Sequence, residues 1–89
     1  MRLDKFLKLS RLIKRRTVAN EACDAGRVSL NGKVARASAE VKAGDIVGIT
    51  FGTRKIEVRV LSIQEVKKKK EASEMYEIVN ESWLEEKQN

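Results

Sequence analysis

The stretch TVANEACDAGRVSLNGKVA, residues 17–35, decides the fold class of this chain. Its first half is typical of a helix that Thr17 caps and that runs to about Ala25, where Gly26 is suited to end it. Its second half favours extended chain around Asn31-Gly32, the dipeptide most suited to a type I′ turn because both positions need a positive φ. The stretch therefore predicts a helix followed by an antiparallel hairpin.

On the N-terminal side of this stretch, residues 3–10 have helical periodicity. Leu3, Phe6 and Leu7 fall on one side of that helix, and lysines and arginines recur on the opposite side. Leu9 lies among the basic residues, so we expect that a later element packs it or that it touches a partner.

In the second helix, Val18, Ala22 and Ala25 form the expected apolar stripe, and its small residues would let the helix lie close to its neighbour. Cys23 is the only cysteine, so no internal disulfide can form. A small buried filler is a more frequent use of such a cysteine than a reactive thiol.

On the C-terminal side, short strands alternate with turns. A turn over residues 41–45 precedes a strand over 46–51, and Gly52-Thr53 turns into a strictly alternating strand over 56–60. Hairpins of this kind build a small sheet. The expected architecture is α+β, with two N-terminal helices packed on a small twisted antiparallel sheet.

One domain is expected over residues 1–66, followed by a basic hinge and a C-terminal tail over 67–89. The apolar residues at the centre of the tail are expected to pack back on the sheet: Met75, Tyr76 and Ile78. Tyr76 and Trp83 could alternatively stack on nucleic-acid bases.

The charge is unevenly placed. The 89-residue chain has 19 lysines and arginines against 13 acidic residues, a net charge of +6 at pH 7. Residues 1–45 carry 11 basic and 5 acidic side chains, whereas residues 46–89 carry 8 of each. A cationic field concentrated in this way attracts polyanions, and a merely solubilising surface needs no such clustering. The sequence therefore indicates a polyanion site in the first half.

The residues needed for most catalytic sites are missing. Histidine is absent, which excludes Ser/His and Cys/His nucleophiles, and one cysteine cannot build a zinc site of the usual kind. The five glycines are dispersed along the chain, so they form no Gly-rich phosphate loop. We therefore expect a binding protein that is not an enzyme and needs no metal or cofactor.

The phosphate site is expected where the two helices meet. Arg11 closes the basic side of the first helix, and Lys14-Arg15-Arg16 follows as the link to the second. Arg16 falls at a helix N-terminus, where free backbone N–H groups and the helix dipole already favour an anion. Lys33, beside the hairpin turn, adds a contact if the hairpin tip folds toward the same face.

Four motifs, in this order, resemble one RNA-binding domain. They are Arg2-Leu3-Asp4-x-Phe6-Leu7, Lys14-Arg15-Arg16-Thr17-x-Ala19, Gly26-Arg27-Val28-x-Leu30-Asn31-Gly32-Lys33 and Val41-Lys42-x-Gly44-Asp45. Together they resemble the domain named after ribosomal protein S-four, over a core motif of residues 1–50. The resemblance implies the αL-motif fold and a basic face that binds structured RNA. It implies RNA contact by seven residues: Arg2, Lys5, Arg11, Lys14, Arg15, Arg16 and Lys33. It also implies that Asp4 holds the basic side chains of the first helix in place.

The interhelical junction and the Met75-Tyr76-Glu77-Ile78-Val79 segment are similar to a narrower group, the bacterial ribosome-associated quality-control proteins of the RqcP type, relatives of heat-shock protein fifteen. That likeness implies binding to the large (50S) ribosomal subunit that carries stalled peptidyl-tRNA, with contacts to 23S rRNA and tRNA. It further implies support for C-terminal alanine tailing by an RqcH/NEMF-type partner. A cytoplasmic monomer that does not bind membranes is expected.

Three other functions stay open. The chain could be a heat-shock recycling or assembly factor for the same subunit. It could be a protein–protein adaptor whose basic face meets an acidic partner. A detached piece of an RNA-modifying enzyme is the third, and the missing catalytic residues speak against it.

Overall fold

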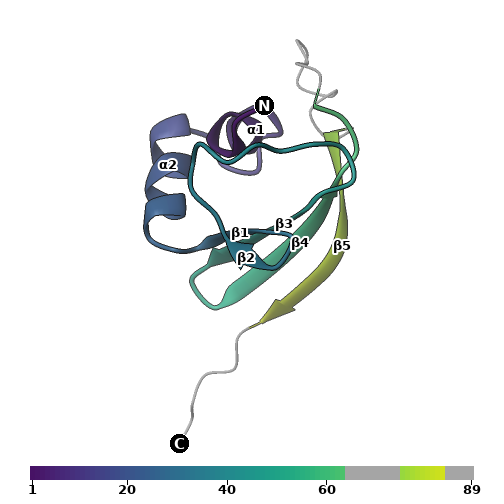
Figure 1. The fold of residues 1–89 in the computed structure, drawn as a ribbon. Coiled ribbons are helices and arrows are strands. Elements are labelled where there is room, and N and C mark those ends of the chain that lie inside the picture. The colour runs from purple at the N-terminus through teal and green to yellow at the C-terminus, as the bar shows by residue number, and fades with distance from the viewer. Residues whose placement is uncertain (64–74, 84–89) are drawn as a thin grey trace, which may run out of the picture.

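The computed structural model describes residues 1–63 and 75–83, which form two helices beside one sheet (Figure 1). The helices are α1 (Leu3–Leu9) and α2 (Arg16–Asp24), and the strands are β1 (Val28–Leu30), β2 (Lys33–Val34), β3 (Ile46–Phe51), β4 (Arg54–Val60) and β5 (Tyr76–Trp83). Neighbouring strands pair antiparallel in the order β2-β1-β3-β4-β5. The predicted α+β architecture is confirmed. Within the described residues, no helix has the length and apolar character needed to cross a membrane.

Helix α1 has the predicted buried side. Leu3, Phe6 and Leu7 are fully buried, and Leu9 is partly buried against the same core. The segment after β2 holds the start of this helix, because the backbone N–H of Leu3 donates to the carbonyl of Ala39 (2.8 Å). The N-terminal end of α1 is therefore hydrogen-bonded to the segment that connects β2 and β3.

Helix α2 begins at Arg16, so Thr17 is already its second residue and the prediction of Thr17 as the N-cap is wrong. Arg15 is the N-cap because it is the last residue with extended φ and ψ, and its side chain makes no capping hydrogen bond. The predicted helix end is confirmed. Gly26 has a φ of 77°, and its N–H donates to the carbonyl of Cys23 (3.0 Å), which closes the last turn.

The buried side of α2 differs from the predicted stripe. Ala19 and Cys23 are buried and Ala22 is partly buried, whereas Val18 is 45% exposed and Ala25 is exposed. The prediction is therefore wrong for Val18 and Ala25. The reason is that α2 turns its row of small side chains toward α1 and the sheet, where they permit close packing. The prediction that Cys23 is a buried filler is confirmed.

The predicted hairpin and strands are present in the middle of the chain. Asn31 and Gly32 have φ values of 53° and 88° and form a two-residue turn that pairs Leu30 with Lys33. Strand β3 has the predicted bounds, and β4 begins two residues before the predicted alternation. Alternate residues of these two strands enter the core: Val47, Ile49, Ile56, Val58 and Val60.

Strand β5 forms one edge of the sheet and pairs with β4. Met75 is buried and Tyr76 partly buried, as predicted, but Ile78 is 52% exposed, so its predicted packing is wrong. Both helices lie away from β5 (Figure 1), so they do not cover this strand. The predicted boundary between residues 66 and 67 and the run Lys67–Lys70 lie outside the described residues.

Asn31 ties the β1–β2 turn to the turn that precedes β3. Its Oδ1 accepts the backbone N–H of Ile46 (2.9 Å), and its Nδ2 donates to Oδ1 of Asp45 (3.2 Å). Its own backbone N–H donates to the carbonyl of Ile46 (2.7 Å). One residue thus supplies both a positive φ and the connection between two turns.

We predict that Asn31→Ala lowers the free energy of unfolding by about 2 kcal/mol, because it loses the side-chain hydrogen bonds and puts alanine in the left-handed region. Asn31→Gly adopts a positive φ at no such cost and loses only the hydrogen bonds, so its effect is expected to be smaller. Urea denaturation measures both losses. Equal stability of Asn31→Ala and the unsubstituted protein would contradict the prediction.

Candidate nucleic-acid interface

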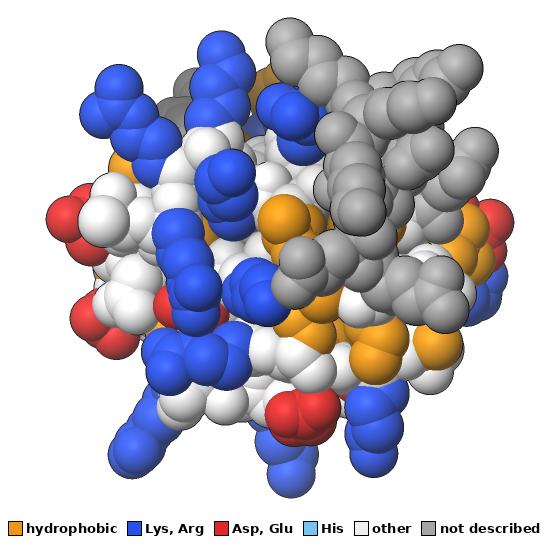
Figure 2. Space-filling view, turned by 90° about the horizontal axis from the view of Figure 1, so that it is seen from above, with side chains coloured by type: hydrophobic (Ala, Val, Ile, Leu, Met, Phe, Trp, Pro, Cys, Tyr) orange, Lys and Arg blue, Asp and Glu red, His pale blue; other side chains and the backbone are white. Residues whose placement is uncertain are grey.

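Six of the seven predicted RNA-contacting residues lie in or beside the two helices, and we call them the cationic face: Arg2, Lys5, Arg11, Lys14, Arg15 and Arg16. All of them are exposed except Lys5, which is partly buried. Figure 2 shows Lys and Arg side chains gathered in a band across the end of the molecule that carries the helices, with acidic side chains mostly at its margins. The helices that carry or flank these residues therefore lie at the end of the molecule where cationic side chains gather.

Asp4 is the buried centre of the cationic face. Nε of Arg2 and a terminal guanidinium nitrogen of Arg16 both donate to its Oδ1, at 3.2 and 3.3 Å. Nδ2 of Asn20 donates to its Oδ2 at 3.3 Å. The expected contact of Asp4 with the basic residues of the first helix is present for Arg2. It also extends to the second helix, so Asp4 holds one guanidinium from each side of the junction.

One carboxylate cannot neutralise both guanidiniums. The Arg2 and Arg16 side chains stay 51% and 47% exposed, whereas the side chain of Asp4 is buried. Burial acts to raise the pKa of Asp4, but the hydrogen bonds from Arg16, Arg2 and Asn20 outweigh burial and hold the pKa below its usual value. Asp4 is therefore ionised at neutral pH, and the cluster keeps a net positive charge that is open to solvent.

The loop before α2 supplies further cations. Lys14 and Arg15 are exposed, and neither makes an ion pair with another residue in the described part of the chain. Because the N-cap of α2 makes no side-chain hydrogen bond, the backbone N–H groups of its first turn have no side-chain cap. A phosphate at this point would meet the helix dipole and two exposed cationic side chains together.

Lys33 does not join the cationic face. It begins β2, and Figure 1 shows the β1–β2 hairpin on the other side of the fold from α1. The hairpin follows the sheet because β1 pairs along β3, with Leu30 opposite Val47. The hairpin tip therefore does not fold toward the helices, and an RNA contact by Lys33 stays a prediction for a separate part of the surface.

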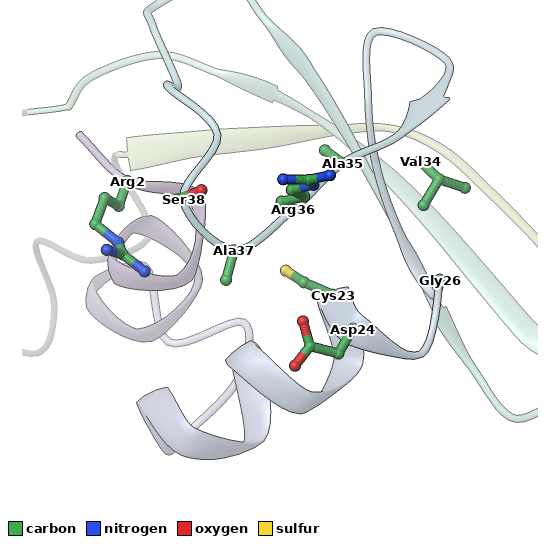
Figure 3. Close-up of a pocket in the computed structure, with 9 residues that line it drawn as sticks. All are labelled: Arg2, Cys23, Asp24, Gly26, Val34, Ala35, Arg36, Ala37 and Ser38. Atoms are coloured by element: carbon green, nitrogen blue, oxygen red, sulfur yellow. The ribbon is translucent and has the colours of Figure 1, made fainter.

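Two residues beside the face were not predicted. Asn20 contacts Asp4 only because α1 and α2 lie side by side, which no spacing in the sequence indicates. Arg36, in the segment after β2, lines a cleft together with Arg2 (Figure 3). Figure 3 also shows the Cys23 side chain reaching from the last turn of α2 toward this segment. No motif marks Arg36, since only the path of the chain brings it near the helices.

Cys23 offers no reactive thiol. Its side chain is buried, and burial together with the charges of Asp4 and Asp24 raises its pKa to about 11. The thiol is therefore protonated at neutral pH and is a poor nucleophile. Among the described residues, no cluster of three or more histidine, cysteine or acidic side chains could hold a metal ion.

Two helices packed on a small antiparallel sheet, with cations gathered at the helix junction, define the S4 class of RNA-binding domains, and the S4 domain family model matches residues 1–47. The RQC P-site tRNA stabilizing factor of Bacillus subtilis (strain 168) is 52% identical over 94% of this chain and 98% of its own length. The factor of the same name from Streptococcus pneumoniae is 50% identical over 97% of this chain and 98% of its own length. The chain therefore belongs to the S4-domain family and, within it, to the RQC P-site tRNA stabilizing factors.

A solved structure supports the fold assignment. The trimeric structure of Vibrio cholerae Heat Shock Protein 15 superposes with a TM-score of 0.82 and 28% sequence identity. The superposition covers 89% of this chain and 81% of that chain. The resemblance to the S-four type of domain, and to the RqcP group in particular, is thus confirmed.

We predict that Asp4→Asn lowers the free energy of unfolding at neutral pH by about 2 kcal/mol, because two arginines lose their shared carboxylate. The loss should depend on pH. Since the pKa of Asp4 lies below the ordinary value of 3.8, its ionised form stabilises the fold above that value. This stabilisation disappears as the pH falls through the lower pKa of the folded state.

Urea denaturation at a series of pH values from about 7 down to about 2, which includes the range where carboxylates titrate, measures the free energy of unfolding. The unsubstituted protein should lose stability on acidification more steeply than Asp4→Asn. Asp24→Asn, which changes an exposed carboxylate, is the control and should keep the steep loss. Parallel acid limbs for the Asp4→Asn and unsubstituted proteins would refute the role given to Asp4.

Proposed function

We propose that this chain stabilises P-site tRNA in ribosome-associated quality control by binding structured RNA through its cationic face. The observation that carries the proposal is the pair Arg2 and Arg16, held half-exposed on one buried carboxylate beside the free cations of the interhelical loop. The relatives that bear the name of a P-site tRNA stabilizing factor align with nearly the whole chain, which supports the same role.

The proposed action is positioning. Guanidinium groups that a carboxylate holds in place lose little further freedom when they bind a phosphate, so they favour one arrangement of the RNA backbone. The face lacks a row of exposed aromatic side chains in the described residues, which favours recognition of folded RNA by shape and phosphate contacts over stacking on single strands. No bond needs to be made or broken for such a function.

The proposed binding partner is the large ribosomal subunit. The chain would bind the large (50S) ribosomal subunit that carries stalled peptidyl-tRNA and contact 23S rRNA and tRNA together. It would act as a monomer and support C-terminal alanine tailing by an RqcH/NEMF-type partner. This chain would contribute to alanine tailing by holding the tRNA in one position.

A second candidate is a recycling or assembly factor of the heat-shock type for the same subunit. The superposition on Heat Shock Protein 15 favours it. The two candidates differ in their need for tRNA, because a P-site factor should bind subunits with P-site tRNA more tightly than empty subunits. Equal binding to both particles would favour the second candidate.

We predict that Arg16→Gln weakens binding to large subunits carrying P-site tRNA by about tenfold and lowers the slope of log K against log salt by about one. Glutamine keeps an amide donor near Asp4, so the fold should be retained, which denaturation checks. Co-sedimentation over a range of salt concentrations measures affinity and slope.

The matched control is Arg59→Gln. It removes the same charge from β4, where Arg59 pairs with Glu77 of the neighbouring strand β5 and does not belong to the cationic face. Its binding and salt slope should stay unchanged. If both substitutions weaken binding equally, the attraction depends on net charge alone and the proposed face is wrong.

A further inference from the structure

A groove of about 600 Å³ lies between the interhelical loop, α2 and the end of β3. Apolar residues from all three elements form its floor: Leu12, Ile13, Val18, Ala22, Ile49 and Phe51. None of the residues in the Asp4 cluster lines it. The groove is therefore a second feature of the surface, separate from the arginines that Asp4 holds.

Two floor residues are large, apolar and exposed. Val18 is 45% exposed on the outer side of α2, and Phe51 is 39% exposed at the end of β3. Ile13 and Ile49, which also line the floor, are buried. The exposed side chains of Val18 and Phe51 thus form one apolar surface together with the buried isoleucines beneath them. Concave apolar surfaces of this kind are typical of interaction sites.

The rim of the groove is cationic. Lys14, Arg15 and Arg27 line it, and no acidic residue of the described ranges 1–63 and 75–83 does. All three are exposed, and none makes an ion pair with another residue that the structure describes. The groove is therefore complementary to a ligand with an apolar centre and negative flanks.

The floor favours a protein ligand over RNA. A nucleobase has hydrogen-bonding edges, and among the described residues that line the groove Thr50 has the sole uncharged polar side chain. Five of the six floor residues are aliphatic. Burying the edges of a base against them would leave those edges without partners, which costs free energy. The aliphatic side chains of a protein segment carry no such cost, and its carboxylates can pair with the rim.

We propose that this groove docks an acidic amphipathic helix of a protein partner. Its aliphatic anchors would lie on Val18 and Phe51, and its carboxylates would meet Lys14, Arg15 and Arg27. A helix presents such anchors on one side at intervals of three and four residues. Lys14 and Arg15 also belong to the cationic face, so RNA and the partner helix would share these two cations. Docking goes beyond the RNA-binding role, since it needs no nucleic acid.

The test is an NMR titration of the full chain, which carries isotope-labelled methyl groups. The ligand is a short synthetic helical peptide that has leucines along one side and glutamates elsewhere. A peptide of the same composition in scrambled order is the control ligand. The methyl signals of Val18 and Ile49 should shift saturably with the helical peptide and much less with the scrambled one. Arg27→Gln should reduce the salt dependence of binding, because one charge pair is lost.

The double substitution Val18→Ala and Phe51→Ala should weaken peptide binding by about tenfold, because both anchoring side chains are truncated. Alanine is a better helix former than valine, so α2 should persist. Ile78→Ala, which truncates an exposed side chain on β5 outside the groove, should leave binding unchanged. No saturable binding, or equal binding by the double variant, would overturn the proposal. Weaker binding of single-stranded RNA by the double variant, with peptide binding unchanged, would also overturn it, because the floor would then hold bases.

Binding of the same variants to large subunits separates the two proposals. The groove variant should keep the affinity of the unsubstituted protein for subunits with P-site tRNA, because Arg2 and Arg16 are intact. If the unsubstituted protein fails to bind subunits but binds the peptide, the proposed RNA function is wrong and the groove proposal stands.

Discussion

A single buried carboxylate governs how the two helices meet. A charge in the core is tolerated only when it is paired and hydrogen-bonded, and Asp4 receives its donors from Arg2, Arg16 and Asn20. Because two of these donors belong to α2, that helix must lie where its side chains reach α1. The small side chain of Ala19 permits the approach. The contact that docks the helices also holds two guanidiniums at the surface, so the fold and the cationic face have one cause.

Those features that local rules decide could be predicted from the sequence. The Asn31-Gly32 turn is one, since few other dipeptides accept two positive φ values. The features that failed depend on how elements are placed relative to one another. An alanine-rich helix offers two nearly equivalent apolar rows, so the outward direction of Val18 is decided by packing. Lys33 lies away from the helices because of the hairpin's path along β3, and Ile78 is exposed because β5 is an edge strand. The residues of the cationic face were predictable from clustering, whereas the contact between Asp4 and the second helix required the helices in place.

Two arginines of β4 are paired with glutamates of β5, so their charges are balanced within the sheet. Arg54 pairs with Glu81 at 2.6 Å and Arg59 pairs with Glu77, both across β4 and β5. The guanidinium of Arg54 also lies 6.0 Å from the centre of the Trp83 ring. Cations near the helices have fewer acids to share. The two strand pairs are thus locally neutral, whereas the Asp4 cluster keeps one guanidinium in excess.

The buried thiol of Cys23 can be used to measure local opening of the structure around α2. Cys23 is buried but lines the cleft beside Arg2 and Arg36, so a modifying reagent reaches its protonated thiol when the packing between α2 and the segment after β2 opens. Because the chain has one cysteine, every modification event comes from that one place. The labelling rate therefore measures how often this helix opens, without any introduced probe. RNA that bridges the two helices would slow the rate, so one sulfur atom can register both opening and occupancy.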